Sequence, residues 1–317
     1  MAMDGIDPDI HRFILRMRED WQRFPPLESM DFPDQRIAAE QVRAPWTVGG
    51  PVMAETLERT FDPGAGELRI RVYRPVAGGG ALPALVYVHG GGFTLFSIDT
   101  HDRLMREYAA QGGFAVIGVD YPLAPEAKFP TALDRIEALM LWLKDNAGQW
   151  GIDPARLAMG GDSAGGNLSF ATCLRLRDRG EPDLVKAILS NYGGFTNIIS
   201  DAAEARFGGP GAILNREEAR GYWANYLRDA ADEANPQACP LLADLRGFPP
   251  VFLVVAELDL VAADSLAMHE RLIQAGVAVE CRVYPGAVHS FLEAMSISPL
   301  ARRAIADGAG FIAGRVG

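Results

Sequence analysis

Residues 156–165 read Arg-Leu-Ala-Met-Gly-Gly-Asp-Ser-Ala-Gly, a short apolar run that leads directly into a G-x-S-x-G pattern. In this pattern a strand passes through a tight turn into a helix, and the serine oxygen projects from the end of the sheet. The turn leaves little room beside the serine, which explains the small residues around it. We therefore predict that Ser163 is a nucleophile and that a helix begins at about Ala164, with its N-terminal amides facing any oxyanion formed there.

Short apolar runs alternate with helical patterns on both sides of this turn. The predicted strands are residues 84–88, 114–119, 156–159, 185–189, 251–256 and 279–284. A helix is predicted from Thr131 to Asn146, where Thr131 and Asp134 have the spacing of a capping box. Strands that are apolar on both faces and alternate with helices indicate an α/β fold with a mainly parallel twisted sheet and helices on both faces. Residues 67–74 alternate instead, which predicts an antiparallel edge strand.

The first 25 residues predict a helix that begins at Asp7 and Pro8, followed by a Pro-rich connector from Phe24 to Pro33. A second unusual stretch, 193–241, shows no strand pattern. It contains one predicted helix, Asn215 to Arg228, in which Asn215 and Glu218 form a capping box.

An insertion after a strand of an open parallel sheet lies over the carboxyl ends of the strands. We therefore expect a helical cap, with Trp223 and Tyr226 near Ser163. The expected division is an N-terminal cap segment 1–50, a core of 51–192 and 242–317, and a cap insertion 193–241.

A glycine-rich loop, His89-Gly90-Gly91-Gly92-Phe93, directly follows the predicted strand 84–88. Its glycines let the backbone approach a substrate closely and turn amides inward, so that these amides and that of Ala164 can bind a developing negative charge. His89 is expected to hold the loop by hydrogen bonding. A phosphate-binding loop is the alternative, but neither G-x-G-x-x-G nor a Walker lysine follows.

The base and the acid are sought after the serine in chain order. Of five histidines, His289 lies in the loop after the last predicted strand, where it could reach the serine and act as general base. Activity should then fall at acid pH, because the base must be neutral. Asp259, just beyond the strand 251–256, could orient that histidine. Glu257 and Asp264 are the alternatives, although their positions favour capping or supporting a turn.

The formal net charge of −11 argues against nucleic acid or an anionic membrane as a partner. The three cysteines lack the spacing of a disulfide framework or a zinc site. We find no signal peptide and no apolar stretch long enough to span a membrane, which predicts a soluble cytoplasmic protein.

The motifs together resemble the hormone-sensitive-lipase-like group of α/β-hydrolases, the bacterial family IV esterases, and more narrowly bacterial acetyl esterases. The resemblance extends from about Leu85 onward and includes His89–Gly92, Asp99–Arg103, Asp120–Glu126, Phe129–Pro130 and Gly161–Gly166. It implies hydrolysis of short-chain acyl esters without a cofactor or metal, a two-part cap and a possible homodimer. It also implies a triad of Ser163, Asp259 and His289 and an oxyanion hole of Gly91, Gly92 and Ala164. From their place in the loop, His89 and Gly90 are expected to support this hole.

The chain departs from the family pattern at three positions. Pro122 replaces a frequent arginine, Leu260 a frequent proline, and Ser290 a common glycine. None of these changes removes a reactive group. Two other functions stay open: an amidase or peptidase with the same triad, and a non-catalytic ligand-binding relative. The presence of His289 weighs against the second.

Overall fold

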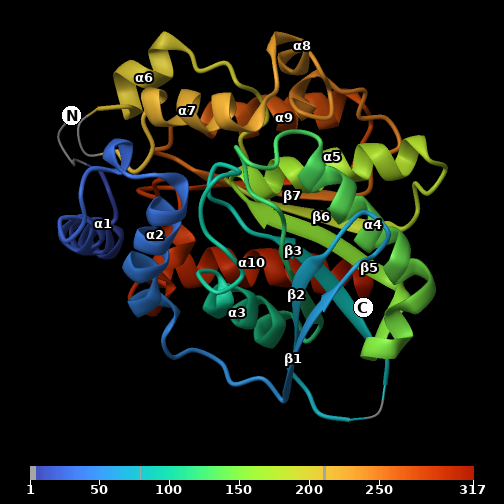
Figure 1. The fold of residues 1–317 in the computed structure, drawn as a ribbon. Coiled ribbons are helices and arrows are strands. Elements are labelled where there is room, and N and C mark those ends of the chain that lie inside the picture. Colours follow the sequence, from blue (N-terminus) through green and yellow to red (C-terminus); the bar gives the residue numbers. More distant parts are fainter. Residues whose placement is uncertain (1–4, 79, 210–211) are drawn as a thin grey trace.

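A computed structural model describes residues 5–78, 80–209 and 212–317, and its strands form one sheet with the order β1-β2-β4-β3-β5-β6-β7-β8 (Figure 1). The strands are β1 (Glu55–Phe61), β2 (Leu68–Arg74), β3 (Leu82–Val88), β4 (Ala115–Asp120), β5 (Ile152–Asp162), β6 (Val185–Asn191), β7 (Val251–Ala256) and β8 (Val279–Tyr284). All pairs are parallel except β1–β2 and β2–β4. The predicted mainly parallel sheet is therefore confirmed.

Helices cover both faces of the sheet because the side chains of each inner strand alternate between two buried clusters. In β3, Val86 and Val88 face one cluster, whereas Leu85 and Tyr87 face the other. The helices of the first cluster are α4 (Thr131–Asn146), α5 (Ala164–Asp178) and α9 (Ala262–Gln274). Those of the second are α3 (Asp102–Gly112) and α10 (Pro299–Val316), with α1 (Pro8–Trp21) packed beside them.

The prediction of an edge strand at residues 67–74 is wrong in one respect. β2 is antiparallel, but β1 pairs along its whole length and forms the edge instead. Most side chains of β1 are exposed, so its sequence carries little of the apolar alternation by which a strand is recognised.

The N-terminal segment contains a helix that the sequence analysis missed. α1 begins as predicted, with the Asp7 carboxylate accepting from the amides of Asp9 and Ile10. The connector, however, ends at Asp31, which caps α2 (Phe32–Thr47). Pro33 lies in the first turn of α2, where proline is tolerated because the amide it lacks has no partner within the helix.

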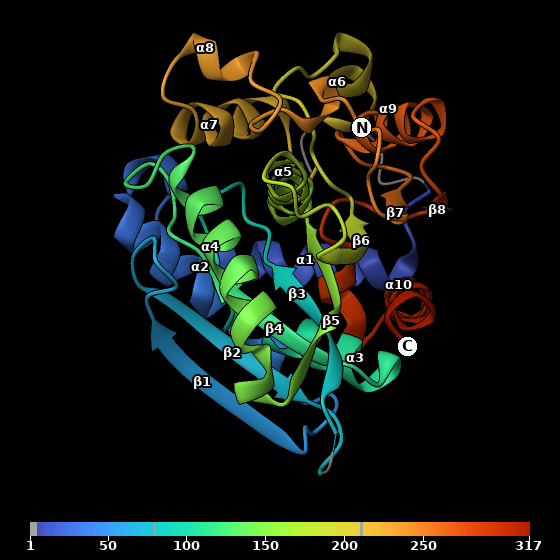
Figure 2. The same cartoon turned by 90° about the vertical axis from the view of Figure 1, so that its right-hand side faces the viewer.

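The insertion is helical in its described residues. It contains α6 (Asp201–Phe207), α7 (Arg216–Tyr226), α8 (Ala230–Glu233) and η3 (Pro240–Leu242). The capping box of Asn215 and Glu218 is confirmed. Figures 1 and 2 show α6, α7 and α8 gathered on one side of the molecule, beyond the ends of the strands.

The capping box predicted at Thr131 and Asp134 is wrong, although α4 has the predicted bounds. Pro130 occupies the cap position, and Asp134 pairs with Arg175 of α5 at 2.7 Å.

The remaining short helices are η1 (Leu27–Ser29), η2 (Ala147–Trp150) and η4 (Phe291–Ser296). Within the described ranges, no helix combines the length and the apolar character that crossing a bilayer requires.

Candidate active site

Four loops meet at one edge of the sheet because their strands are parallel and close neighbours. β3 leads into the glycine loop, β5 into Ser163, β7 into Asp259 and β8 into His289. Residues that are far apart along the chain are thereby brought to the same place, at the carboxyl ends of the strands.

Ser163 lies on a strained turn between β5 and α5. Its φ of 52° and ψ of −117° lie in a region that residues with a side chain rarely adopt. Its amide donates to the carbonyl of Asn191 at 2.9 Å, which ties the turn to the end of β6. A Cβ atom at Gly161 or Gly165 would collide with the carbonyl oxygen of Val88, so the two glycines allow the turn to lie directly against β3.

This contact predicts opposite effects for two glycine-to-alanine substitutions in helices. Gly165→Ala should destabilise the protein by about 3 kcal/mol or more, because the colliding atom belongs to the backbone and cannot move aside. Gly310→Ala, in α10, meets no atom within 4 Å and should stabilise by about 0.5–1 kcal/mol. Urea unfolding of both variants measures the difference. Equal stabilities would contradict the close approach at Gly165.

Ser163, His289 and Asp259 form one hydrogen-bonded chain. The Nε2 atom of His289 lies 2.9 Å from the Ser163 Oγ, and its Nδ1 lies 2.8 Å from an Asp259 carboxylate oxygen. The Asp259 side chain is fully buried and that of His289 is nearly so. A carboxylate can only accept, so Asp259 keeps the proton on Nδ1 and leaves Nε2 free to accept from the serine.

The two alternative acids support turns instead, as the sequence analysis expected. Glu257 accepts from the amide of Gly286 at 2.8 Å. Asp264 accepts from the amides of Phe195 and Thr196, and burial raises its pKa to about 7. Neither carboxylate contacts His289 among the described hydrogen bonds.

The glycine loop presents unpaired amides beside the serine. Gly91 and Gly92 have φ values of 116° and 59°, which favour glycine. The carbonyl of Gly91 accepts from Thr94 and Leu95, whereas no hydrogen bond within the described part of the chain uses the amides of Gly91 or Gly92. These amides, with that of Ala164 at the start of α5, are candidate donors to an oxyanion.

His89 is packed beneath this loop. Its ring stacks on Tyr121 with centroids 4.4 Å apart, and its Nδ1 contacts the carbonyl oxygen of Gly90 at 2.7 Å. Tyr121 donates in turn to the His89 carbonyl. Burial, reinforced by the charge of His101, lowers the pKa of His89 to about 3, so that the ring is neutral at neutral pH.

Helix α7 lies over the glycine loop. Tyr226 stacks on Phe93 with ring centroids 3.8 Å apart, and Trp223 contacts the same ring at 5.3 Å. The ring of Tyr222 packs directly against Gly92, at the position that a Cβ atom would occupy. Trp223 and Tyr226 thus contact the glycine loop, their expected proximity to Ser163 stays a prediction, and Tyr222 is an additional contact that the sequence analysis missed.

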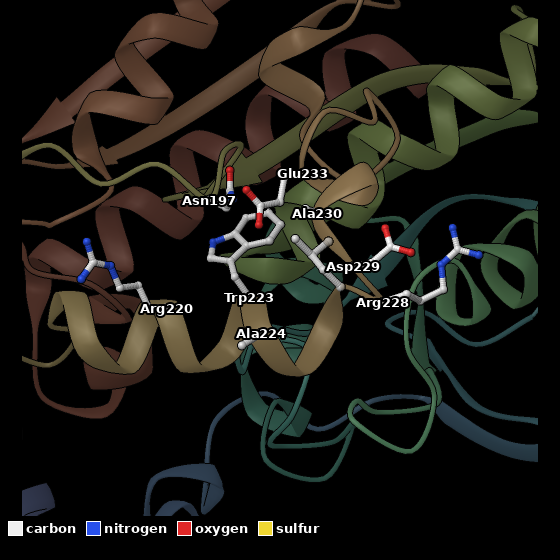
Figure 3. Close-up of a pocket in the computed structure, with 9 residues that line it drawn as sticks. Asn197, Arg220, Trp223, Ala224, Arg228, Asp229, Ala230 and Glu233 are labelled. Carbon is white, nitrogen blue, oxygen red and sulfur yellow. The ribbon is translucent and has the colours of Figure 1, made fainter.

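A hollow of about 390 Å³ lies beside α7 (Figure 3). Figure 3 shows Trp223 pointing from α7 toward Asn197 and Glu233. The remaining lining residues are Arg220, Ala224, Leu227, Arg228, Asp229 and Ala230. None of Ser163, His289 and Asp259 lines the hollow, although Trp223 also contacts Phe93 of the glycine loop.

Asp162 and His101 are further residues of the site whose roles the sequence analysis missed. Asp162, the variable residue of the G-x-S-x-G motif, accepts from the amide of Gly90 at 3.1 Å and lies 3.3 Å from His101. Burial raises the pKa of Asp162, but the charge of His101 and the hydrogen bonds outweigh it and hold the pKa below its ordinary value. The run Asp99–Arg103, matched only as a family motif, was the available signal.

Comparisons with known proteins identify the family of this chain. A family profile described as alpha/beta hydrolase fold matches residues 85–293. An acetyl esterase of Salmonella schwarzengrund is 37% identical over 254 residues, which are 79% of this chain and 77% of the relative. The solved structure of a hyperthermophilic esterase from Pyrobaculum calidifontis has a TM-score of 0.89, 31% identity and 98% coverage of both chains. A thermostable carboxylesterase from a metagenomic library has a TM-score of 0.86 and 32% identity, covering 91% of this chain and 99% of the other.

The chain belongs to the α/β-hydrolase fold family. Within that family it is an enzyme, an esterase of the serine-hydrolase type.

Proposed function

We propose that this esterase hydrolyses short-chain acyl esters of carboxylic acids through a Ser163–His289–Asp259 triad and an acyl-enzyme intermediate. The observation that carries the proposal is the chain of two hydrogen bonds at His289, 2.9 Å to Ser163 and 2.8 Å to Asp259. A nucleophile, a base within reach of it and a carboxylate that orients the base are the components that acyl transfer requires.

The proposed reaction has two steps. His289 removes the proton of Ser163 as the serine oxygen attacks the ester carbonyl, and the amides of Gly91, Gly92 and Ala164 stabilise the oxyanion. His289 then protonates the departing alcohol, and the acyl group remains on the serine. Water repeats the sequence and releases the carboxylic acid.

The amides in the proposed oxyanion hole are held by the surrounding loop. The Gly90 amide donates to the Asp162 carboxylate, and the Gly91 carbonyl accepts from the amides of Thr94 and Leu95. Donors fixed in advance cost no reorganisation when charge develops, which is the main advantage of such a site over water. We assign His89 and Gly90 a supporting role here.

We further propose that residues 1–50 and 193–241 form a two-part cap over a core of 51–192 and 242–317. Arg36 of α2 donates to the carbonyls of Thr94 and Ala124, each at 2.9 Å. Lys128 donates to the carbonyls of Ala224 and Leu227, which fastens the end of α7. Both parts of the cap are thus attached to the loops around the glycine motif.

Tyr222 supports the short-chain preference, because its ring closes space beside Gly92. Tyr222→Ala should raise the ratio of kcat/KM for an octanoyl ester over an acetyl ester by about tenfold, since apolar contacts of a few methylenes are worth that much or more. A chain-length series of 4-nitrophenyl esters measures this ratio. Tyr222→Phe keeps the ring and serves as the control. A ratio that is unchanged in the alanine variant would remove Tyr222 from the acyl site.

Covalent labelling tests the mechanism directly. An organophosphonate ester should react once with the protein, modify the peptide that contains Ser163 and abolish hydrolysis of an acetyl ester to the same extent. Labelling elsewhere, or full activity of the labelled protein, would overturn the proposal.

Matched ester and anilide substrates distinguish the esterase from an amidase, because the aniline that an anilide releases is a poorer leaving group than the alcohol of the ester.

A further inference from the structure

Four buried charged side chains form a continuous cluster behind the serine turn. They come from four separate elements: Arg43 from α2, His101 from the start of α3, Asp162 from the end of β5 and Glu293 from η4. Their exposed fractions are 5%, 2%, 3% and 2%. Burial of isolated charges is costly, so an arrangement of two cations and two anions requires an explanation.

The contacts in the cluster run from the N-terminal segment to the nucleophile. Arg43 lies 3.2 Å from one Glu293 oxygen, and the other Glu293 oxygen lies 3.4 Å from the His101 Nε2. The same Nε2 lies 3.3 Å from Asp162, which directly precedes Ser163. The cluster therefore joins α2 to the turn that carries the nucleophile.

Hydrogen-bond geometry indicates that His101 carries two protons. Its Nε2 faces the carboxyl groups of Asp162 and Glu293; the pKa of Asp162 is held below its ordinary value, so this group accepts, whereas burial raises the pKa of Glu293. Its Nδ1 lies 2.9 Å from the Thr100 hydroxyl, whose own proton is donated to the carbonyl of Ser97 at 2.8 Å. In that orientation the hydroxyl oxygen accepts from Nδ1, and the Ser97 carbonyl, 3.3 Å from Nδ1, accepts as well. This arrangement, with the Asp162 carboxylate beside Nε2, favours the imidazolium form of His101.

Asp162 transmits this arrangement to the reacting groups. One of its oxygens accepts from the Gly90 amide at 3.1 Å and from the Tyr87 hydroxyl at 3.0 Å, while the other faces His101. A side chain at Gly90 would collide with this carboxylate. The position of Asp162 thus sets the separation between the glycine loop and the serine turn.

We propose that the charged His101, balanced by Glu293 and Arg43, is a positioning residue that fixes Asp162 and thereby the glycine loop relative to Ser163. The proposal rests on the esterase mechanism above for its kinetic part only. Among the described side-chain contacts, none joins His101 or Glu293 to Ser163, His289 or Asp259, and we assign the effect of both charges to Asp162. A second consequence is that the Arg43–Glu293 salt bridge couples α2 to the serine turn, in addition to the hydrogen bond that Arg36 makes beside the glycine loop.

The residue types His101, Asp162 and Glu293 could also hold a metal ion. Arg43 weighs against this alternative, because its guanidinium already lies beside Glu293 and would repel a second cation. Removal of the Arg43 charge distinguishes a metal site from a charged His101. If the cluster were a metal site, loss of that charge would strengthen metal binding.

Because His101 is charged, the positioning of Asp162 depends on pH. The charged groups that face it are Asp162, Glu293 and Arg43, with Glu40 beyond Ser97 and the ring of His89 at 5.5 Å. Burial lowers the pKa of His101, but the two carboxylates outweigh it and raise the pKa above the ordinary value. The stabilisation that comes from the charge of His101 is therefore fully present below the ordinary histidine pKa and is lost as the pH rises through the raised pKa. The loss falls on the alkaline side of the activity profile.

Two variants, which remove side chains of opposite charge from the cluster, provide the test. Glu293→Gln removes an anion that favours the imidazolium, so the alkaline limb of the kcat profile should move to lower pH by about one unit. At the pH optimum of the wild type, kcat should fall while KM stays unchanged. Arg43→Met should move the same limb to higher pH, and the double variant should return it toward the wild-type position. Glu137→Gln, which removes another buried carboxylate paired with arginine at 2.7 Å, should leave the limb in place.

A titration of the histidine ring signals by NMR keeps the test independent of catalysis. With only five histidines, the His101 signal is assigned by its absence in His101→Gln. It should titrate above the ordinary histidine range in the wild type and move down in Glu293→Gln. Three results would overturn the proposal. The first is a neutral His101 at pH 6, and the second is a shift of the alkaline limb of kcat in the same direction in both single variants. The third is a stoichiometric metal in the purified protein. Failure of ester hydrolysis with a normal titration would instead refute the proposed function alone.

Discussion

Ser163→Ala is expected to lower kcat for an acetyl ester on the order of 10⁶-fold. The variant keeps the Cβ atom and removes only the hydroxyl oxygen, which lies 2.9 Å from His289. Without that oxygen no acyl-enzyme can form, and only the oxyanion donors and substrate binding remain. The measurement is the steady-state hydrolysis of 4-nitrophenyl acetate by wild type and variant at equal concentration.

The fold of this variant should be intact, which separates loss of chemistry from loss of structure. The strained turn at Ser163 is imposed by Gly161, Gly165 and the bond from its amide to Asn191, and none of these depends on the hydroxyl. Thermal unfolding should therefore occur near the wild-type temperature. Hydrolysis within tenfold of wild type by a purified, folded variant would be incompatible with a serine nucleophile at this position.

The positions of the reacting groups were predictable because they depend on patterns that are local in sequence. Strands β7 and β8 have the predicted bounds. β7 is an apolar run that is buried throughout, whereas β8 lies at the edge of the sheet and is buried only at Tyr284. Once these strands are parallel neighbours, the loops that carry Asp259 and His289 must meet at one edge of the sheet. The geometry of that meeting, however, comes from the structure alone.

Other features could not be read from local patterns. Helix α2 was missed because prolines at positions 25, 26 and 33 suggested a connector, whereas Pro33 lies in the first turn of the helix. Arg43 and Glu293 are 250 positions apart and carry no motif, so only the folded chain brings them to His101. Ser290 is understandable in retrospect, because its φ of 59° is a conformation that glycine adopts without strain.

Asp259→Asn is expected to lower kcat about 10⁴-fold, with little change in stability. The Asp259 carboxylate accepts from His289 at 2.8 Å and from the amide of Val261 at 3.1 Å. An asparagine can keep its oxygen toward Val261 and turn its NH₂ group toward Nδ1, which then must accept. His289 would carry its proton on Nε2, facing Ser163, and could no longer act as a base.

Glu257→Gln is the matched control for this substitution, since it changes the alternative acid from the same loop. Among the described hydrogen bonds, the Glu257 side chain accepts one, from the Gly286 amide at 2.8 Å, and a glutamine oxygen can accept it equally. Hydrolysis of 4-nitrophenyl acetate by this variant should therefore stay within a few-fold of wild type, because loss of one exchanged hydrogen bond is worth only about 1 kcal/mol. If Glu257→Gln were the inactive variant and Asp259→Asn the active one, the acid of the triad would be Glu257, and the tautomer of His289 would be set through the loop rather than by Asp259.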